Sequence, residues 1–187
     1  MIQTKLANGF NSIGNEYDIT KTDFLTEHGF QSIGNVGELI KNGIPTKSNL
    51  LSCGVYSISI PKNYLPQFII PADALANGNV LSPWSIERLK SKWVENADII
   101  YFGLAGAKSN RSLKKRINDL IKHANGATSD RGPHKGGEII WQLNGFEEFK
   151  VWIYPTGLPP EPRIIEEKLI RRFFNQTSKL PFGNRQF

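Results

Sequence analysis

The chain has 187 residues, 39% of them hydrophobic and 11% aromatic, which is enough for a buried core and argues against a chain without stable structure. Its net charge of +6 favours a polyanionic partner, although charge alone does not establish nucleic-acid binding. The single cysteine, Cys53, excludes a disulfide framework. The sequence shows neither a signal peptide nor an apolar stretch near the ~20 residues that span a membrane. We therefore expect a cytoplasmic protein that does not bind membranes.

Residues 1–49 are rich in Asn, Gly, Thr and Ser, and we expect them to form an N-terminal arm or subdomain ahead of a second unit over residues 50–187. The string GFNSIGN at residues 9–15 returns as GFQSIGN at residues 29–35. Two copies are too few for a solenoid, so the repeat predicts two similar turn-plus-strand elements or a partly duplicated arm. Its Gly and Asn residues are typical of turns, although they could also present backbone amides to phosphates.

The run from Leu50 to Ile60 predicts the first strand of the second unit. Its last apolar residues alternate with Ser57 and Ser59, which is typical of a strand with one solvated face. Pro61 ends this pattern. Prolines and an Ala-Asn-Gly-Asn segment follow, and we expect residues 61–97 to form an insertion before the next core strand.

Within and after this insertion, residues 85–94 carry apolar side chains on one helical face, and residues 99–104 are predicted to form a second strand. A basic amphipathic helix should follow, because apolar residues recur at helical spacing. These are Leu113, Ile117, Leu120, Ile121 and Ala124. Arg116 and His123 fall together on one flank of the apolar stripe and Lys114 on the other.

The last third of the chain predicts a hairpin and a helix. A glycine-rich loop over residues 126–137 precedes two strand-like runs, residues 138–143 and 149–154, which are joined across an Asn-Gly pair. Prolines lead into a helix over residues 163–174. The four tryptophans are expected in the core. Together the elements predict an α+β fold with a small, mostly antiparallel central sheet flanked by helices.

Glu166 is the carboxylate of the closing helix that should point inward, because it lies three and four residues before two apolar residues of that helix. Glu167 instead has Arg163 and Arg171 one turn away on the outer side. An ionised Glu166 on the buried face would cost several kcal/mol unless a cation matched it. A metal ion or an arginine must therefore face it, and a buried salt bridge with Arg116 is the structural alternative.

Five short motifs follow one another along the second unit. They are Gly54-Val55-Tyr56, Tyr101-Phe102-Gly103, Leu113-Lys114-Lys115-Arg116, Glu166-Glu167-Lys168-Leu169-Ile170 and Asn184. In this order they resemble the motifs of the GIY-YIG nucleases, a family that includes homing and restriction endonucleases and the incision subunit of excision repair. The chain departs from the family in two ways: an insertion of about forty residues lies between the first two motifs, and Leu120 stands where many members have a histidine one turn after the arginine. His123, the nearest substitute, lies about 10 Å farther along the helix axis.

The resemblance implies hydrolysis of a DNA phosphodiester with a divalent cation, Mg²⁺ or Mn²⁺, held mainly by Glu166. It further implies that Arg116 holds the scissile phosphate, that Tyr56 is the general base for the attacking water, and that Tyr101 orients water or phosphate beside it. A free tyrosine has a pKa near 10, so nearby positive charge would have to lower that of Tyr56 by about 3, or ~4 kcal/mol. Asn184 would close the site by hydrogen bonding to Glu166 or substrate, and a plain turn residue is the alternative.

Five basic residues are candidates for contacts with nucleic acid: Lys114, His123, His134, Lys135 and Arg185. The glycines that follow His134 and Lys135 allow close approach of the backbone to a ligand, although an ordinary flexible loop is equally consistent with them. We therefore expect a metal-dependent DNA endonuclease of a restriction or repair type. The alternatives are a non-catalytic nucleic-acid-binding domain on the same fold and an RNA-directed nuclease.

Overall fold

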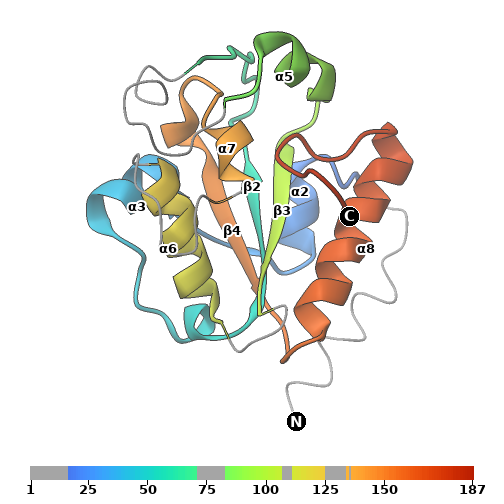
Figure 1. Cartoon of the computed structure of the whole chain (residues 1–187). Coiled ribbons are helices and arrows are strands. Elements are labelled where there is room, and N and C mark those ends of the chain that lie inside the picture. Colours follow the sequence, from blue (N-terminus) through green and yellow to red (C-terminus); the bar gives the residue numbers. More distant parts are fainter. Residues whose placement is uncertain (1–16, 71–82, 107–110, 125–133, 135) are drawn as a thin grey trace.

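The computed structural model describes residues 17–70, 83–106, 111–124, 134 and 136–187 (Figure 1). In this part of the chain four strands form one antiparallel sheet in the order β1-β4-β2-β3. The strands are β1 (Gln31–Asn35), β2 (Gly54–Ser59), β3 (Ile99–Ala105) and β4 (Lys150–Pro155). Helices lie against the sheet, so the predicted α+β class, with a small antiparallel sheet flanked by helices, is confirmed.

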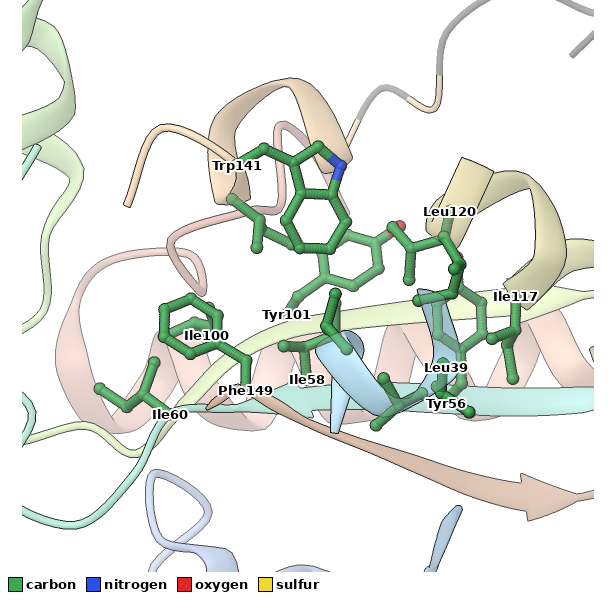
Figure 2. Packing of buried hydrophobic residues seen from close by; sticks show 14 of the residues in the cluster. Leu39, Tyr56, Ile58, Ile60, Ile100, Tyr101, Ile117, Leu120, Trp141 and Phe149 are labelled. Atoms are coloured by element: carbon green, nitrogen blue, oxygen red, sulfur yellow. The ribbon is translucent and has the colours of Figure 1, made fainter. Parts of the chain in front are cut away.

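Two apolar clusters fill the space between the sheet and its helices. The α-helices are α2 (Thr22–Glu27), α3 (Val36–Asn42), α5 (Ile86–Lys92), α6 (Leu113–Ala124), α7 (Gly137–Ile140) and α8 (Glu161–Thr177). One cluster joins α3, α5, α6 and α7 to Tyr56 and Ile58 of β2, and part of it is drawn in Figure 2. The other joins α2 and α8 to Val55 of β2 and Phe102 of β3. Helices therefore cover both faces of the sheet, with α6 and α8 on opposite faces.

The predicted solvated face of the first strand is wrong, because every residue of β2 is buried. Its serines are satisfied internally. The Ser57 hydroxyl donates to the Tyr101 carbonyl at 2.9 Å, and the Ser59 hydroxyl accepts from the Trp152 indole N–H at 2.8 Å. A small hydroxyl that finds a partner can be buried at little cost, so alternation with serine did not mark exposure here.

Most of the predicted elements are confirmed. The second strand, the basic helix and the closing helix lie where the sequence indicated, and the helix predicted over residues 85–94 is α5. Trp93 and Trp141 are buried as expected, whereas Trp84 and Trp152 are only partly buried. Among the described residues, no helix combines the length and the apolar character needed to cross a bilayer.

The predicted hairpin is wrong. Residues 138–143 begin as α7 and contribute one isolated β-bridge, between Leu143 and Phe68. The Asn-Gly pair leads through Gly145, at φ +74°, into a short 3-10 turn, η2 (Phe146–Glu148), and only then into β4. Every residue of this run is buried, including the polar Glu138 and Gln142, so the run has no solvated face and its periodicity does not distinguish a helical turn from a strand.

The second copy of the repeat forms the predicted turn and strand. Gly29, at φ +78°, ends the turn after α2, and the following residues form β1, which pairs with β4. Asn35 then caps α3, because its side chain accepts the Glu38 N–H at 2.8 Å while Glu38 accepts the Asn35 N–H at 2.9 Å. The described part of residues 1–49 thus supplies an edge strand to the sheet, whereas the first copy lies outside the described residues.

Candidate functional site

Tyr56 of β2 and Tyr101 of β3 lie side by side in the sheet, with ring centroids 5.8 Å apart. Two glycines make this packing possible. A Cβ on Gly103, which pairs with Tyr56 across the two strands, would lie 2.5 Å from Tyr56 Cζ. A Cβ on Gly136 would lie 2.4 Å from Tyr101 Cε2. Any larger residue at either position would displace a tyrosine ring.

The two phenols are not equivalent. Burial raises the pKa of both groups, and that of Tyr101 lies well above its ordinary value. The hydrogen-bonding interaction between them lowers the pKa of Tyr56 and raises that of Tyr101. Tyr56 is therefore the phenol that would ionise first.

Arg116 approaches these phenols from α6. Burial lowers the pKa of its guanidinium, but interactions with Tyr56, Tyr101 and Asp119 outweigh burial and raise it overall. In return Arg116 lowers the pKa of Tyr56, although burial dominates and leaves that pKa above 10. The expected positive charge is thus present beside the tyrosine, but Arg116 alone does not lower the tyrosine pKa to the range needed for a base at neutral pH.

Glu166 approaches the same phenols from α8, on the other face of the sheet. Burial raises the pKa of its carboxyl to about 7, against the charges of Arg163 and Arg116, which lower it. The charge of Glu166 also raises the pKa of Tyr56 and that of Tyr101. The four predicted side chains therefore interact electrostatically with one another. Because no ion pair joins Glu166 to Arg116, the alternative of a simple buried salt bridge is not realised. The adjacent Glu167 pairs with Arg171 at 2.8 Å, as predicted.

His134, a predicted contact with nucleic acid, is 3% exposed and lies against Tyr56. Its Nε2 atom is 2.7 Å from Tyr56 Oη, and its Nδ1 atom accepts the Gly137 N–H at 3.1 Å. Burial, together with Arg116 and His123, holds its pKa well below the usual value, so the ring is neutral. With Nδ1 acting as an acceptor, the proton lies on Nε2, which donates to Tyr56.

The other predicted contact residues are distributed differently from the expectation. His123, also a predicted contact with nucleic acid, is likewise buried and only 3% exposed. Lys114 donates to the Thr46 hydroxyl at 3.2 Å, and Lys135 lies outside the described residues. Arg185 remains on the surface, where it pairs with Glu138 of α7.

Asn184 clamps the C-terminal segment to β3. Its Oδ1 atom accepts the Phe102 N–H at 3.0 Å, and its Nδ2 atom donates to the Phe102 carbonyl at 2.8 Å. The side chain is buried and binds the backbone between Tyr101 and Gly103 rather than the Glu166 carboxylate. Its predicted hydrogen bond to Glu166 is therefore wrong. The alternative of a turn residue is borne out in part, because the Asn184 N–H donates to the Pro181 carbonyl at 2.9 Å. Asn184 holds the edge strand instead.

Comparison of the chain with protein-family models, curated proteins and solved structures gave no match.

Among the described residues, no group of three or more His, Cys, Asp or Glu side chains could hold a metal ion by itself. Glu166 is the one predicted ligand, and it has no ion-pair partner in the described part of the chain. Mg²⁺ commonly binds through one or two carboxylates and completes its coordination with water and substrate phosphate. The donor set therefore fits a cation that is shared between the protein and a phosphate.

Sequence reasoning missed the role of His134 in this site. The signal that could have found it is the pair of glycines two and three residues later. A Cβ on Gly136 would collide with Tyr101, and a Cβ on Gly137 would lie 2.7 Å from His123 Nδ1. Two consecutive glycines after a histidine are thus the mark of a tightly packed turn here, not of a flexible loop.

Proposed function

We propose that the protein is a metal-dependent endonuclease that hydrolyses DNA phosphodiester bonds. The observation that carries this proposal is the electrostatic coupling of Tyr56, Tyr101, Arg116 and Glu166, which come from four different elements. Phosphodiester hydrolysis requires groups that bind the phosphate, accept a proton and hold a divalent cation. These four side chains can supply all three.

Glu166 would hold Mg²⁺ or Mn²⁺. The fit rests on a carboxyl group that burial leaves with a pKa of about 7 and that has no ion-pair partner among the described residues. When bound, the ion would act as a Lewis acid and stabilise negative charge on the phosphate and on the departing 3′ oxygen.

Arg116 would bind the scissile phosphate. Its guanidinium already lies beside the phenols, with a raised pKa that keeps it charged. A planar fork of N–H donors matches two phosphate oxygens, which a lysine ammonium does not. The positive charge then lies where negative charge grows as the water oxygen attacks phosphorus.

Tyr56 would accept the proton of the attacking water. His134 donates to the Tyr56 oxygen, and interactions with Arg116 and Tyr101 lower the pKa of Tyr56. Donors of this kind stabilise the phenolate relative to the phenol. Because burial still leaves the pKa of Tyr56 raised, further positive charge from a substrate-bound cation would be needed to complete the change.

Cleavage of duplex DNA tests the proposal, with Mg²⁺ or Mn²⁺ present and Glu166→Gln as the central variant. Cleavage should disappear in this variant, while DNA binding should largely survive. Glu167→Gln is the matched control, because it removes a neighbouring carboxylate that is paired with Arg171 on the outer side. It should retain cleavage.

Failure of the parent protein to cut DNA with either ion would refute the endonuclease proposal and favour a non-catalytic nucleic-acid-binding domain. Matched DNA and RNA substrates decide between DNA and RNA as the target, because they differ at the 2′-hydroxyl. We place the activity in the cytoplasm, where the single, buried thiol of Cys53 would stay reduced.

A further inference from the structure

Trp84 lies at the centre of a group of cations that the proposed catalytic site does not use. The guanidinium carbon of Arg88 lies 3.3 Å from the centre of the indole ring, that of Arg185 lies 5.3 Å from it, and Lys92 Nζ lies 5.6 Å from it. Arg88 and Lys92 belong to α5, and Arg185 belongs to the C-terminal segment. We call these four residues the Trp84 cluster.

The ring is held in place from the core side. Trp84 donates its backbone N–H to Gln142 Oε1 at 2.8 Å, and its carbonyl accepts from Gln142 Nε2 at 2.9 Å. Gln142 itself is 1% exposed. The two hydrogen bonds with Gln142 fix the position of Trp84, and Arg88 stacks on its ring with the charge at the surface. The cations are therefore already in place before a ligand binds.

Positive charge in the cluster is not balanced. Among the described residues, the only ion pair made by its three cations is that of Arg185 with Glu138. Lys92 donates to the Asn184 carbonyl at 2.6 Å, which is a neutral partner. Burial, together with the charges of Arg185 and Arg88, lowers the pKa of Lys92 to about 8. Like charges held together at a fixed platform are unfavourable unless an anion joins them.

The cluster is also tied to the proposed catalytic site. Lys92 binds the carbonyl of Asn184, whose side chain clamps Phe102 between Tyr101 and Gly103. Glu138, the partner of Arg185, lies in α7, which begins next to Gly136 and the Tyr101 ring. In Figure 1, α5 lies beyond α7 and the C-terminal segment at one end of the sheet.

We propose that the Trp84 cluster is a binding site for a backbone phosphate of the nucleic acid, away from the scissile bond. Two guanidinium groups supply paired donors to phosphate oxygens, and Lys92 adds a third cation. The face of Trp84 is occupied by Arg88, so the indole serves as a support for the arginine and does not stack on a base. The inference rests on the proposed function only in taking nucleic acid as the source of the phosphate.

Binding of labelled duplex DNA tests this inference in the Glu166→Gln background, where no cleavage complicates the measurement. Arg88→Gln in that background should weaken binding about 3- to 30-fold at low salt, equally across sequences. The slope of log K against log salt should fall by about 1, because one phosphate contact is lost. Lys90→Gln is the matched control: it removes the same charge from an exposed position of the same helix, outside the cluster.

Proton uptake gives a second, independent measurement. An anion at the cluster favours charged Lys92, so binding near pH 8 should take up protons in the parent, as measured by calorimetry in buffers of different ionisation heat. The groups that face Lys92 are Arg88 on its own helix and Arg185 on the C-terminal segment, with Glu138 of α7 behind Arg185. Lys92→Met should abolish most of this uptake.

Equal affinity and equal salt slope for Arg88→Gln and Lys90→Gln would overturn the inference. Saturable binding of inorganic phosphate at micromolar concentration, lost in Arg88→Gln, would also overturn it in favour of a site for a small phosphate ligand. The proposed nuclease function fails separately, if the parent does not cut DNA while Arg88→Gln still weakens binding.

Discussion

The Nε2 atom of His134 lies 2.7 Å from Tyr56 Oη, although the two residues are 78 positions apart in the chain. The Gly137 N–H occupies Nδ1, so Nε2 carries the proton and donates to the phenol oxygen. His134 thereby positions Tyr56, and a hydrogen bond donated to the phenol oxygen favours its ionised form.

His134→Ala should slow DNA cleavage by about 10- to 100-fold, because a hydrogen bond to a charged group is worth about 1.5–3 kcal/mol. Loss of the donor raises the pKa of Tyr56, so the pH at which the cleavage rate reaches its plateau should move upward. His134→Gln, whose amide can still donate, should recover part of the rate. The measurement is the pH–rate profile at saturating Mg²⁺. An unchanged profile in His134→Ala would exclude this role.

Site residues could be predicted where a local sequence pattern indicates the orientation of the side chain. They could not be predicted where that orientation depends on packing between segments far apart in the chain. Glu166 follows from its helical spacing against apolar residues, and Arg116 from its position on the flank of α6. The burial of His134 depends on how the segment before α7 packs against Tyr101, which no local periodicity records. The run at residues 138–143 failed as a strand because complete burial removes the solvated face that would reveal its period.

Trp84 is a second residue whose environment could not be predicted from the sequence. An apolar residue type predicted burial, but the ring is only partly buried and carries a stacked arginine. Aromatic residues serve as platforms for cations as well as core residues, and only the tertiary arrangement tells the two uses apart.

Glu166→Gln should make the folded protein more stable at pH 8. Burial raises the pKa of Glu166 from 4.5 to about 7, so the folded state disfavours its ionised form. The contribution of this group to stability is complete below pH 4.5 and is lost as pH rises through 7. Because the carboxyl keeps some contact with water, we expect a gain of about 1 kcal/mol at pH 8, less than the ~3 kcal/mol that the full change in pKa represents.

Urea unfolding at pH 5 and pH 8 measures this difference, which should be small at pH 5. Added Mg²⁺ should stabilise the parent at pH 8 more than Glu166→Gln, because a cation that binds the ionised carboxylate favours the folded state. Equal stability of the two proteins at both pH values would mean that Glu166 is not disfavoured as an anion.

Gly103→Ala should abolish cleavage while leaving the protein folded. The added Cβ would lie 2.5 Å from Tyr56 Cζ and 2.6 Å from its oxygen, so the phenol ring must move. Overpacking of this kind costs about 1–3 kcal/mol of stability. Cleavage should fall far more than stability does, because Tyr56 would lose its alignment with Arg116 and His134. Thermal unfolding alongside the cleavage assay separates the two effects, and wild-type cleavage by a stably folded variant would contradict the proposed role of Tyr56.

Asn184→Ala should destabilise the edge strand. The substitution removes both hydrogen bonds to the Phe102 backbone and leaves a buried N–H and carbonyl without these partners. Each such loss costs about 1–3 kcal/mol, so the two together should decrease the free energy of unfolding by about 2–6 kcal/mol. Asn184→Asp retains an acceptor for the Phe102 N–H but loses the donor to its carbonyl. Amide hydrogen exchange along β3 is the decisive measurement, and it should accelerate from Ile99 to Ala105 while β4 stays protected. Exchange that is unchanged in β3 would show that the C-terminal segment does not hold this strand.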